Sequence, residues 1–270
     1  MDEIVTLHEA ADPRLENYRN LRWNRNPDTK THDFIVEGRY CVERLLRSNL
    51  TVHSVLLTEG RARMIHEHVP AMVPVYSLPL PEMQKLVGFD FHRGVMARAS
   101  RPPLHEFTSF KPEDGRSELA IAILGISERE NVGSIMRTSA ALGVEHIFIG
   151  PQTADPYARR TIRVSMGSVF SLKLYELSDP SSQLQTLANQ HQLRTIVSTL
   201  ATDATPLRDF RLARQSGILI AGNEAKGVAK EIQKIATDRV TIPMQMGTDS
   251  LNVAIATAIC LHELTQQRID

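Results

Sequence analysis

Apolar and polar positions alternate along the C-terminal half of the chain in two different rhythms. The runs ELAIAILGI, EHIFIG, FSLKLYEL, RTIVSTL, GILIAG and RVTIPM are short and largely apolar, so each predicts a buried strand. NVGSIMRTSAAL, SSQLQTLANQ and the stretches from about Val228 and Ser250 have apolar residues at helical spacing, and Gly143 ends the first of these helices. This alternation predicts an α/β fold with a mostly parallel sheet that helices cover on both faces.

The N-terminal part has a similar pattern on a smaller scale. DFIVEGRYCVERLLRSNL predicts a strand that turns at Glu37 and Gly38 into an amphipathic helix, VHSVLLTE and VPVYSL predict further strands, and RARMIHEHV predicts a helix. Residues 100–117 contain three prolines and mixed charges without periodicity, which is typical of a linker. We therefore expect a smaller α/β domain over residues 1–105 and a larger domain over residues 117–270.

The composition is that of an ordinary soluble globular protein, with 42% hydrophobic and 23% charged residues. The 31 basic residues equal the 31 acidic ones, so net charge draws the chain to neither nucleic acid nor membrane, although a local basic face is compatible with it. The N-terminus is acidic without an apolar core, unlike a signal peptide, and no apolar run is long enough to span a bilayer. Cys41 and Cys260 lie in apolar segments, which predicts buried, reduced thiols in a cytoplasmic protein.

Open parallel sheets bind ligands beyond the carboxyl ends of their strands, so the loops after AILGI, ILIAG and VTIPM are candidate sites. The first loop leads into the NVGSIMRTSAAL helix. Asn131 stands where an N-cap residue would, Gly133 permits close backbone approach, and Ser134 and Arg137 lie near the start of the helix. The glycine spacing matches neither the dinucleotide fingerprint nor a phosphate loop. An ordinary capped helix with a surface arginine would explain this stretch equally well.

The second and third loops hold the remaining polar positions. In GNEAKGV, Gly222 allows a turn that a side chain would block, and Glu224 is placed to point into the crevice or to cap a backbone amide, although a plain turn would explain both. In IPMQMGTDSLNVAIATA, Pro243 takes the chain off the strand ladder and Ser250 suits the N-cap of the next helix. Asn252 then falls in the first turn of an apolar helix, where it contributes little unless its amide has a task.

In combination, these three stretches resemble the three motifs of the SpoU/TrmH-type RNA ribose 2'-O-methyltransferases of the SPOUT superfamily. The resemblance covers the chain from about Leu119 to its end and departs from the family at Ala254, where serine is common. It implies a deep trefoil knot, which composition would never suggest because knots are almost absent from proteins. The N-terminal part, chiefly through DFIVEGRYCVERLL, resembles the RNA-binding domain that often precedes this one. The expected fold is thus a knotted C-terminal methyltransferase domain with a smaller N-terminal α/β RNA-binding domain.

The resemblance implies transfer of a methyl group from S-adenosylmethionine to a ribose 2'-hydroxyl of rRNA or tRNA. The backbones at Gly222, Ile242 and Leu251 would hold this cofactor, with Met244 and Gly247 in the same pocket. Holding oxygen, carbon and sulfur in line would supply most of the rate advantage, because effective molarity is worth roughly 7–11 kcal/mol.

The polar motif positions would carry the reaction. Arg137 matches the arginine that engages or activates the hydroxyl in the family. A guanidinium stays protonated and offers no acceptor, so steering the ribose through its phosphate suits Arg137 better than general-base catalysis. Asn252 would orient the hydroxyl or Arg137, and Glu224 would hold its loop or Arg137, with Asn131 and Ser250 at the other polar positions. Which group takes the proton stays open.

RNA and a second copy of the chain are the expected partners. Arg159, Arg160 and Arg163 fall in a loop expected near the crevice, and Arg22 and Arg25 belong to an N-terminal basic stretch. Phosphate contacts of this kind set affinity rather than sequence choice, and a solvated surface is the alternative for both groups. The apolar stretch SLNVAIATAICLHELTQQ would let two C-terminal domains pair as a homodimer, as is typical of the superfamily.

Two other functions stay open. A knotted RNA-binding protein without catalysis would have the same fold, but the intact polar motif positions favour an enzyme. A doubly wound enzyme with a nucleotide cofactor would need the glycine fingerprint that is missing from this sequence. His66 and His68 are two residues apart on an expected helix and have no cysteine pair nearby, so we expect no metal site.

Overall fold

A computed structural model of the chain describes residues 4–21, 33–60, 65, 68–92, 94–113, 117–224, 226–247 and 250–267. The chain forms two compact units. Unit 1 consists of Met1–Pro103 together with Pro156–Phe170, and unit 2 consists of Leu104–Asp155 together with Ser171–Asp270. Pro156–Phe170 therefore packs with unit 1, although it falls inside the 117–270 range that the sequence assigns to the second domain.

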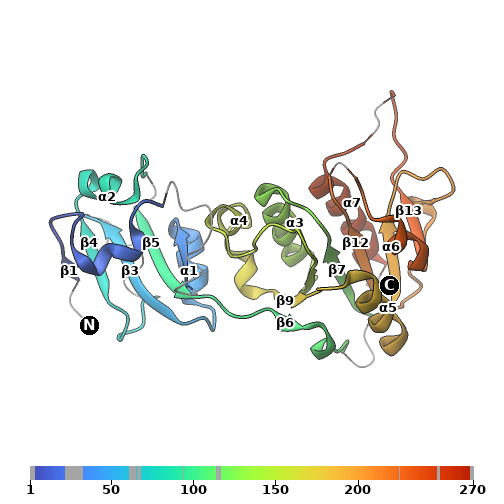
Figure 1. Cartoon of the computed structure of the whole chain (residues 1–270), viewed down its shortest axis with the longest axis horizontal. Coiled ribbons are helices and arrows are strands. Elements are labelled where there is room, and N and C mark those ends of the chain that lie inside the picture. The colour runs from blue at the N-terminus through green and yellow to red at the C-terminus, as the bar shows by residue number, and fades with distance from the viewer. Residues whose placement is uncertain are drawn as a thin grey trace. The chain divides into compact units, whose positions relative to one another are not determined.

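Unit 1 is built on a sheet of five described strands in the order β1-β4-β3-β5-β2 (Figure 1). β1, β4 and β3 run parallel, whereas β5 is antiparallel to both β3 and β2. The strands are β1 (Val5–Thr6), β2 (Asp33–Glu37), β3 (Val52–Thr58), β4 (Val75–Leu78) and β5 (Val95–Ser100). The helices are η1 (Pro13–Tyr18), α1 (Arg39–Leu46), α2 (Leu80–Val87), α4 (Arg159–Val164) and, at the end of the inserted segment, η5 (Ser168–Ser171). The strands expected at DFIVEG, VHSVLLTE and VPVYSL are confirmed, while the helix expected at RARMIHEHV lies mostly outside the described residues.

Helix α4 contradicts the sequence prediction, which expects a loop throughout PQTADPYARRTIRVSMGS. Its residues include β-branched threonine, isoleucine and valine, which are weak helix formers, so local propensity gives little sign of it. Tertiary packing stabilises the helix instead. Ile162 is fully buried, and the ring centroid of Tyr157 lies 5.3 Å from that of Phe34 on β2. Most helical stability in proteins comes from such tertiary contacts.

Unit 2 contains a wholly parallel sheet of eight described strands in the order β11-β13-β10-β12-β7-β8-β9-β6. The strands are β6 (His105–Glu106), β7 (Leu119–Ile123), β8 (His146–Ile149), β9 (Lys173–Glu176), β10 (Arg194–Ser198), β11 (Thr205–Pro206), β12 (Gly217–Ala221) and β13 (Asp238–Thr241). All six strands expected in this part of the chain are present. The expected linker also contributes, because β6 joins this sheet and Phe110 lies in its core.

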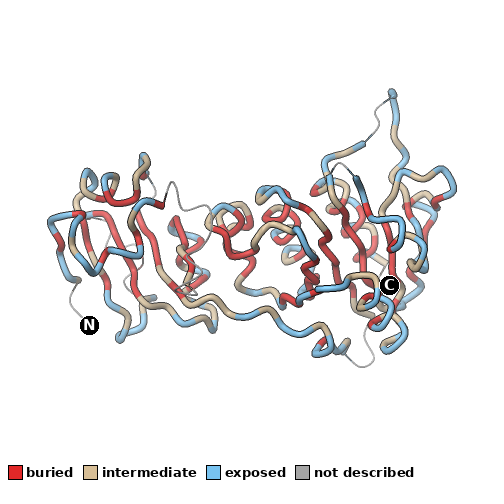
Figure 2. Tube along the Cα trace, viewed as in Figure 1, coloured by how far each residue is buried: buried red, intermediate tan, exposed pale blue. Residues whose placement is uncertain are grey.

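Helices cover both faces of the unit 2 sheet, as the alternation predicts (Figure 1). They are α3 (Arg129–Ala141), α5 (Pro180–His191), α6 (Lys230–Ile235) and α7 (Val253–Gln266), with the single turns η4 (Phe107–Ser109) and η6 (Leu207–Asp209). Leu184 of α5 and Ile232 of α6 join one core cluster with Ala120 and Ala122 of β7. The alternate residue Ile121 points to the opposite face, where α7 contacts β12 and β10 and packs against α3. The central strands β7, β8 and β12 are accordingly buried at every residue, whereas the edge strands β6 and β11 are not (Figure 2).

The middle of this sheet has the order β13-β10-β12-β7, so β7, β12 and β13 end at the same edge. The three motif loops follow these ends directly. Gly143 closes α3 with φ +71°, in the left-handed conformation expected of a glycine just past a helix end. Cys41 and Cys260 are both buried, as predicted.

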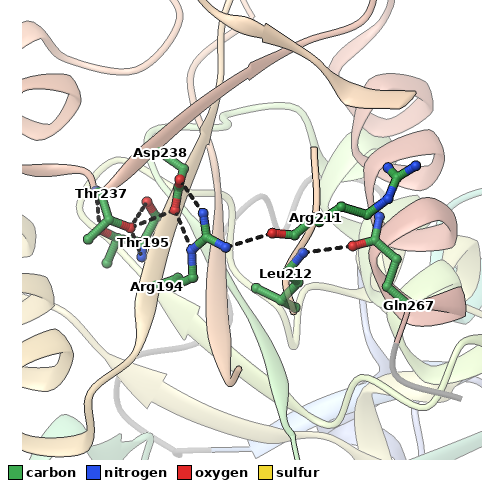
Figure 3. Close-up of polar contacts among 7 residues, drawn as sticks. All are labelled: Arg194, Thr195, Arg211, Leu212, Thr237, Asp238 and Gln267. Carbon is green, nitrogen blue, oxygen red and sulfur yellow. Dashed lines mark hydrogen bonds and ion pairs between the residues drawn. The ribbon is translucent and has the colours of Figure 1, made fainter. Parts of the chain in front are cut away.

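A polar network ties the opposite, N-terminal edge of the sheet (Figure 3). Arg194, the first residue of β10, forms a two-pronged ion pair with Asp238, the first residue of β13, and also donates to the Arg211 carbonyl at 2.7 Å. Thr195 and Thr237 join the same two strands, because the backbone amide of each donates to the hydroxyl of the other at 2.9 and 3.0 Å. The network fixes the start of β13 far along the strands from the motif loops.

Candidate active site

The first motif loop leaves β7 and enters α3 at Arg129, with Glu128 at the N-cap position. The sequence predicts Asn131 as the N-cap, but it is the third residue of the helix. Only 5% of it is exposed. A side chain at that position points inward rather than along the helix end. A buried amide needs hydrogen-bond partners, and those partners define the site.

Asn131 connects all three motif loops. Its Nδ2 donates to Oε1 of Glu224 at 3.0 Å and to Oε2 of Glu128 at 3.2 Å, while its Oδ1 accepts from Nδ2 of Asn252 at 2.9 Å. Carboxylates only accept hydrogen bonds, so the two glutamates require the amide nitrogen on their side and leave the oxygen for Asn252. The sequence prediction that the three turns converge is confirmed by this chain of contacts within unit 2.

Asn252 is the N-cap of α7, which corrects the assignment of that place to Ser250. Its Oδ1 accepts from the backbone amides of Ala254 at 2.9 Å and Ile255 at 3.3 Å, and its backbone is extended with φ −53° and ψ 137°. Asparagine caps a helix as well as serine does. Ser250 is exposed two residues earlier. Asn252 thus has two tasks, since its oxygen caps α7 and its nitrogen orients Asn131.

The GNEAKGV loop folds tightly against the first loop. A Cβ on Gly222 would lie 2.5 Å from the backbone nitrogen of Val228 and 2.6 Å from the carbonyl of Gly227, so only glycine fits. Asn223 donates to the carbonyl of Gly125 at 2.8 Å and accepts from the amide of Lys226 at 3.0 Å. Asn223 was not predicted as a site residue, although asparagine is the residue expected to form such a local bond in a turn.

Arg137 lies apart from this hydrogen-bond chain. It is the ninth residue of α3 rather than near its start, and six residues of helix place it about 9 Å along the axis from Asn131. Its side chain is exposed and makes no hydrogen bond or ion pair with any residue that the structure describes. The alternatives in which Asn252 or Glu224 would hold Arg137 are therefore replaced by contacts of both with Asn131.

The third loop offers main-chain groups at the same edge. Ile242, Met244 and Leu251 are half-buried, and within the described residues their backbone amides donate to no other backbone group. Gly247 has φ +71°, which only glycine adopts without strain. Residues 248 and 249 lie outside the described part of the chain. The loop thus has backbone donors ready for a ligand that is recognised by the main chain, which fits the kind of pocket expected from the sequence.

The predicted RNA-binding arginines have different surroundings. In unit 1, Arg159 donates to Oε2 of Glu37 at 2.9 Å. Its guanidinium carbon also lies over the ring of Phe89, 4.5 Å from the ring centroid. Burial lowers the pKa of Arg159, and the Glu37 carboxylate opposes this effect. Arg163 approaches the same carboxylate at 3.9 Å, whereas Arg160 is exposed. Arg22 and Arg25 lie outside the described residues.

The described residues form neither a metal-ligand cluster nor a helix that could span a membrane. No group of three or more histidine, cysteine or acidic side chains is arranged to hold a metal ion there, and His66 falls outside that part of the chain. No helix in the described ranges combines the length and the apolarity that crossing a bilayer requires.

Comparison with known proteins connects this geometry to one family. The SpoU rRNA Methylase family model matches residues 118–262. The chain is 33% identical to an "Uncharacterized tRNA/rRNA methyltransferase" of Mycobacterium tuberculosis, over 98% of this chain and 92% of that protein. It is 25% identical to a 23S rRNA (uridine(2479)-2'-O)-methyltransferase of Streptomyces viridochromogenes, over 96% and 92% of the two chains. The fold resembles the SpoU methyltransferase AviRb of Streptomyces viridochromogenes in complex with AdoMet, with a TM-score of 0.81 at 23% identity over 96% of this chain and 99% of that one.

Proposed function

The chain belongs to the SpoU rRNA methylase family, and we propose that it transfers a methyl group from S-adenosylmethionine to a ribose 2'-hydroxyl of a structured rRNA or tRNA. The observation that carries the proposal is the hydrogen-bond chain from Glu224 through Asn131 to Asn252, which joins the three motif loops at the carboxyl edge of the sheet. The similarity to a 2'-O-methyltransferase of Streptomyces viridochromogenes supports the ribose specificity.

S-adenosylmethionine is the cofactor of this family, and the third loop is suited to it. The backbone amides of Ile242, Met244 and Leu251 would donate to its polar edges. Gly222 and Gly247 would allow the main chain to come close, because neither position has a side chain in the way. When bound, the cofactor supplies an electrophilic methyl group on a sulfonium, so the protein has no anionic intermediate to stabilise.

The polar side chains would position the acceptor. Arg137 has an exposed guanidinium, which would grip the phosphate next to the reacting ribose in a two-pronged contact. Asn131 and Asn252 would hold the floor of the acceptor site rigid, and Glu224 would keep the second loop against the first. Ser250 is exposed beside the cap and would contact the ribose or its phosphate.

RNA would extend over further basic residues. Arg160 is exposed and suits a phosphate contact, and Arg159 and Arg163, which also contact Glu37, would add two further guanidinium groups. Arg22 and Arg25 complete the expected RNA-binding set. Such contacts would set affinity and salt dependence.

Three further properties follow from family membership. The C-terminal half would contain a trefoil knot, in keeping with the return of α7 to β12 and β10 in the middle of the sheet after the chain has formed β13. Two copies would pair through this half, and Ile255 and Ile259, exposed one turn apart on α7, would be covered in the dimer. The protein would act in the cytoplasm on structured RNA.

The decisive experiment measures methyl transfer from radiolabelled S-adenosylmethionine to deproteinised ribosomal RNA and to transfer RNA from cells that lack the gene. Mass spectrometry then maps any new ribose methylation. We expect label in one RNA class at a single nucleotide, and calorimetric binding of S-adenosylmethionine but not of NAD. RNA binding without transfer to either RNA class would instead favour the non-catalytic RNA-binding protein.

A further inference from the structure

Unit 2 has a cavity between α6, the helix that follows the GNEAKGV loop, and the start of β13. Its volume is about 470 Å³, and its lining residues are Lys230, Gln233, Lys234, Ala236, Thr237 and Arg239. The lining thus includes three cationic side chains and no acidic one. This concentration is notable in a chain whose basic and acidic residues are equal in number.

Two acidic residues next to this cavity, Asp238 and Asp203, already form ion pairs with arginines. Asp238 is held by both prongs of Arg194, which turns its charge toward the neighbouring strand β10 (Figure 3). Asp203 forms an ion pair with Arg239 at 2.7 Å, in which both side chains are largely exposed. Lys230 and Lys234, by contrast, make no ion pair with any residue in the described ranges, so the cavity keeps a net positive charge.

The two lysines face the cavity together. They are four residues apart on α6, which places them on one face of the helix, one turn apart. Like charges at this spacing destabilise a helix, so the arrangement favours an anion that both ammonium groups contact. Glu231 lies three residues before Lys234 on the same helix, a spacing at which side chains are neighbours, but the two form no ion pair among the described residues and Glu231 does not line the cavity.

The walls of the cavity are rigid. Thr237 is fixed to Thr195 of β10, because their backbone amides and hydroxyls exchange hydrogen bonds at 2.9 and 3.0 Å (Figure 3). Gln233 donates to the carbonyl of Val228 at 2.8 Å, which ties α6 to the end of the GNEAKGV loop. These bonds hold the backbone around the cavity in place, so the side-chain freedom lost on binding is mainly that of the exposed lysines Lys230 and Lys234.

We propose that this cavity binds the phosphodiester backbone of the RNA substrate, outside the segment that carries the reacting ribose. The inference rests on the proposed function and names a part of the substrate contact that the motifs do not include. Small-molecule sites are lined mainly by apolar and aromatic side chains, whereas this lining has one alanine and no aromatic ring to hold a base. Lysine ammonium groups bind phosphates as point charges without reading sequence, so the contact would add affinity to any RNA of suitable shape.

The salt dependence of RNA binding tests the proposal. The double variant Lys230→Gln/Lys234→Gln removes the two unpaired charges, and Lys111→Gln/Lys173→Gln is the matched control, since it removes two exposed lysines of unit 2 elsewhere. Binding of deproteinised ribosomal RNA and of transfer RNA is measured by fluorescence anisotropy between 50 and 300 mM potassium chloride, together with calorimetric binding of S-adenosylmethionine.

We expect the slope of log K against log salt to fall by roughly 1.4 to 1.8 in the cavity variant and to stay unchanged in the control. At 0.1 M salt this corresponds to roughly 25- to 60-fold weaker RNA binding, with S-adenosylmethionine affinity unaltered. An unchanged slope in a variant of an active wild-type enzyme would overturn the cavity proposal alone. A wild type that binds neither RNA would overturn the proposed function and the cavity proposal with it. Tight binding of pyrophosphate that the cavity variant abolishes, with an unchanged RNA slope, would assign the cavity to a free phosphate anion instead.

Discussion

The side-chain nitrogen of Asn252 donates to the side-chain oxygen of Asn131 at 2.9 Å, although the two residues are 121 positions apart in the sequence. This bond joins the start of α7 to the first turn of α3. Glu224 contacts the other end of the same Asn131 amide at 3.0 Å. The orientation of one buried amide is therefore set from both neighbouring loops, so a change in either loop reaches the other through Asn131.

Substitution of Asn252 separates its two tasks. Asn252→Ala removes both the cap and the bond to Asn131, so we expect a loss of roughly 0.5–2 kcal/mol in the free energy of unfolding and a rate of methyl transfer lowered roughly a hundredfold. Asn252→Asp keeps the acceptor that caps α7 but has no nitrogen to donate to Asn131. It should keep the capping contribution to stability but lose roughly 1–3 kcal/mol because the buried Asn131 oxygen then faces a second acceptor, and its rate should fall as in the alanine variant. Full activity of the aspartate variant would show that Asn131 needs no donor there.

Arg137→Ala should slow catalysis strongly without affecting the fold. The side chain is exposed, so the free energy of unfolding should change by no more than roughly 0.5 kcal/mol. Loss of a charged contact to the acceptor should lower the methylation rate by roughly two to three orders of magnitude. Arg137→Lys keeps the charge but not the planar fork and should recover only part of the rate. If calorimetry showed instead that the alanine variant no longer binds S-adenosylmethionine, Arg137 would belong to the cofactor pocket.

Gly222→Ala should disturb the cofactor pocket directly. The added Cβ would lie 2.5 Å from a backbone nitrogen, and a backbone atom cannot move aside as a flexible side chain can. Overpacking of this kind destabilises by roughly 1–3 kcal/mol, and we expect S-adenosylmethionine binding to weaken in calorimetry. Gly143→Ala is the control, because Gly143 has φ +71° but no neighbouring atom within 4 Å. It should lower stability by roughly 1–2 kcal/mol through backbone strain alone and leave binding intact.

Arg194→Ala should lower stability without changing the chemistry. The guanidinium binds the Asp238 carboxylate and the Arg211 carbonyl at the edge of the sheet opposite the site, and the pair is only 23% and 17% exposed. Losing hydrogen bonds to charged groups in such surroundings costs roughly 1.5–3 kcal/mol, which denaturant unfolding would measure. Arg208→Ala removes an arginine that is 80% exposed and should change stability by no more than roughly 0.5 kcal/mol. Equal effects of the two substitutions would contradict a structural role for the Arg194 network.

His146 should make the stability of unit 2 depend on pH. Burial, with a contribution from Lys173, lowers the pKa of His146 to about 4 from its ordinary value of 6.5. Between these two pKa values, His146 is protonated in the unfolded chain but neutral in the folded protein. The free energy of unfolding therefore falls as the pH drops from 6.5 to about 4. Over this range the loss amounts to roughly 3 kcal/mol relative to His146→Gln, which has no proton to bind. Parallel pH profiles of the wild type and this variant in denaturant unfolding would contradict the prediction.

Six of the eight described strands of the unit 2 sheet, and its helices α3, α5, α6 and α7, could be predicted from the sequence because their periodicity is a local property, whereas the two-residue strands β6 and β11 are too short to show a period. Helix caps could not be predicted with the same certainty. Ser250 and Asn252 both have a side-chain oxygen that can cap a helix. Which of them becomes the N-cap depends on the residue at which the IPMQMGTDS loop ends and α7 begins, and tertiary packing decides that residue. The same holds for Asn131, whose place inside α3 follows from a helix that begins two residues earlier, at Arg129.

Long-range partners were beyond the reach of sequence reasoning. Nothing near Arg159 indicates that its carboxylate partner is Glu37, 122 positions away, so a basic stretch of this kind is easily interpreted as an RNA surface. The order of the three motifs, by contrast, did indicate that the loops converge, because the carboxyl ends of parallel strands share one edge of a sheet. Which side chains touch within that convergence became clear only in three dimensions.

The inserted segment Pro156–Phe170 limits how this protein can be divided and how it is made. Truncation after Pro103 would not isolate unit 2, because the remaining fragment would expose Tyr157, Ile162 and Val169, which are buried in the intact chain. A stand-alone catalytic fragment would need a designed bridge from Asp155 to Ser171 that returns from the end of β8 to the start of the parallel strand β9. During synthesis, moreover, the smaller unit cannot complete its packing until residues 104–155 have also left the ribosome.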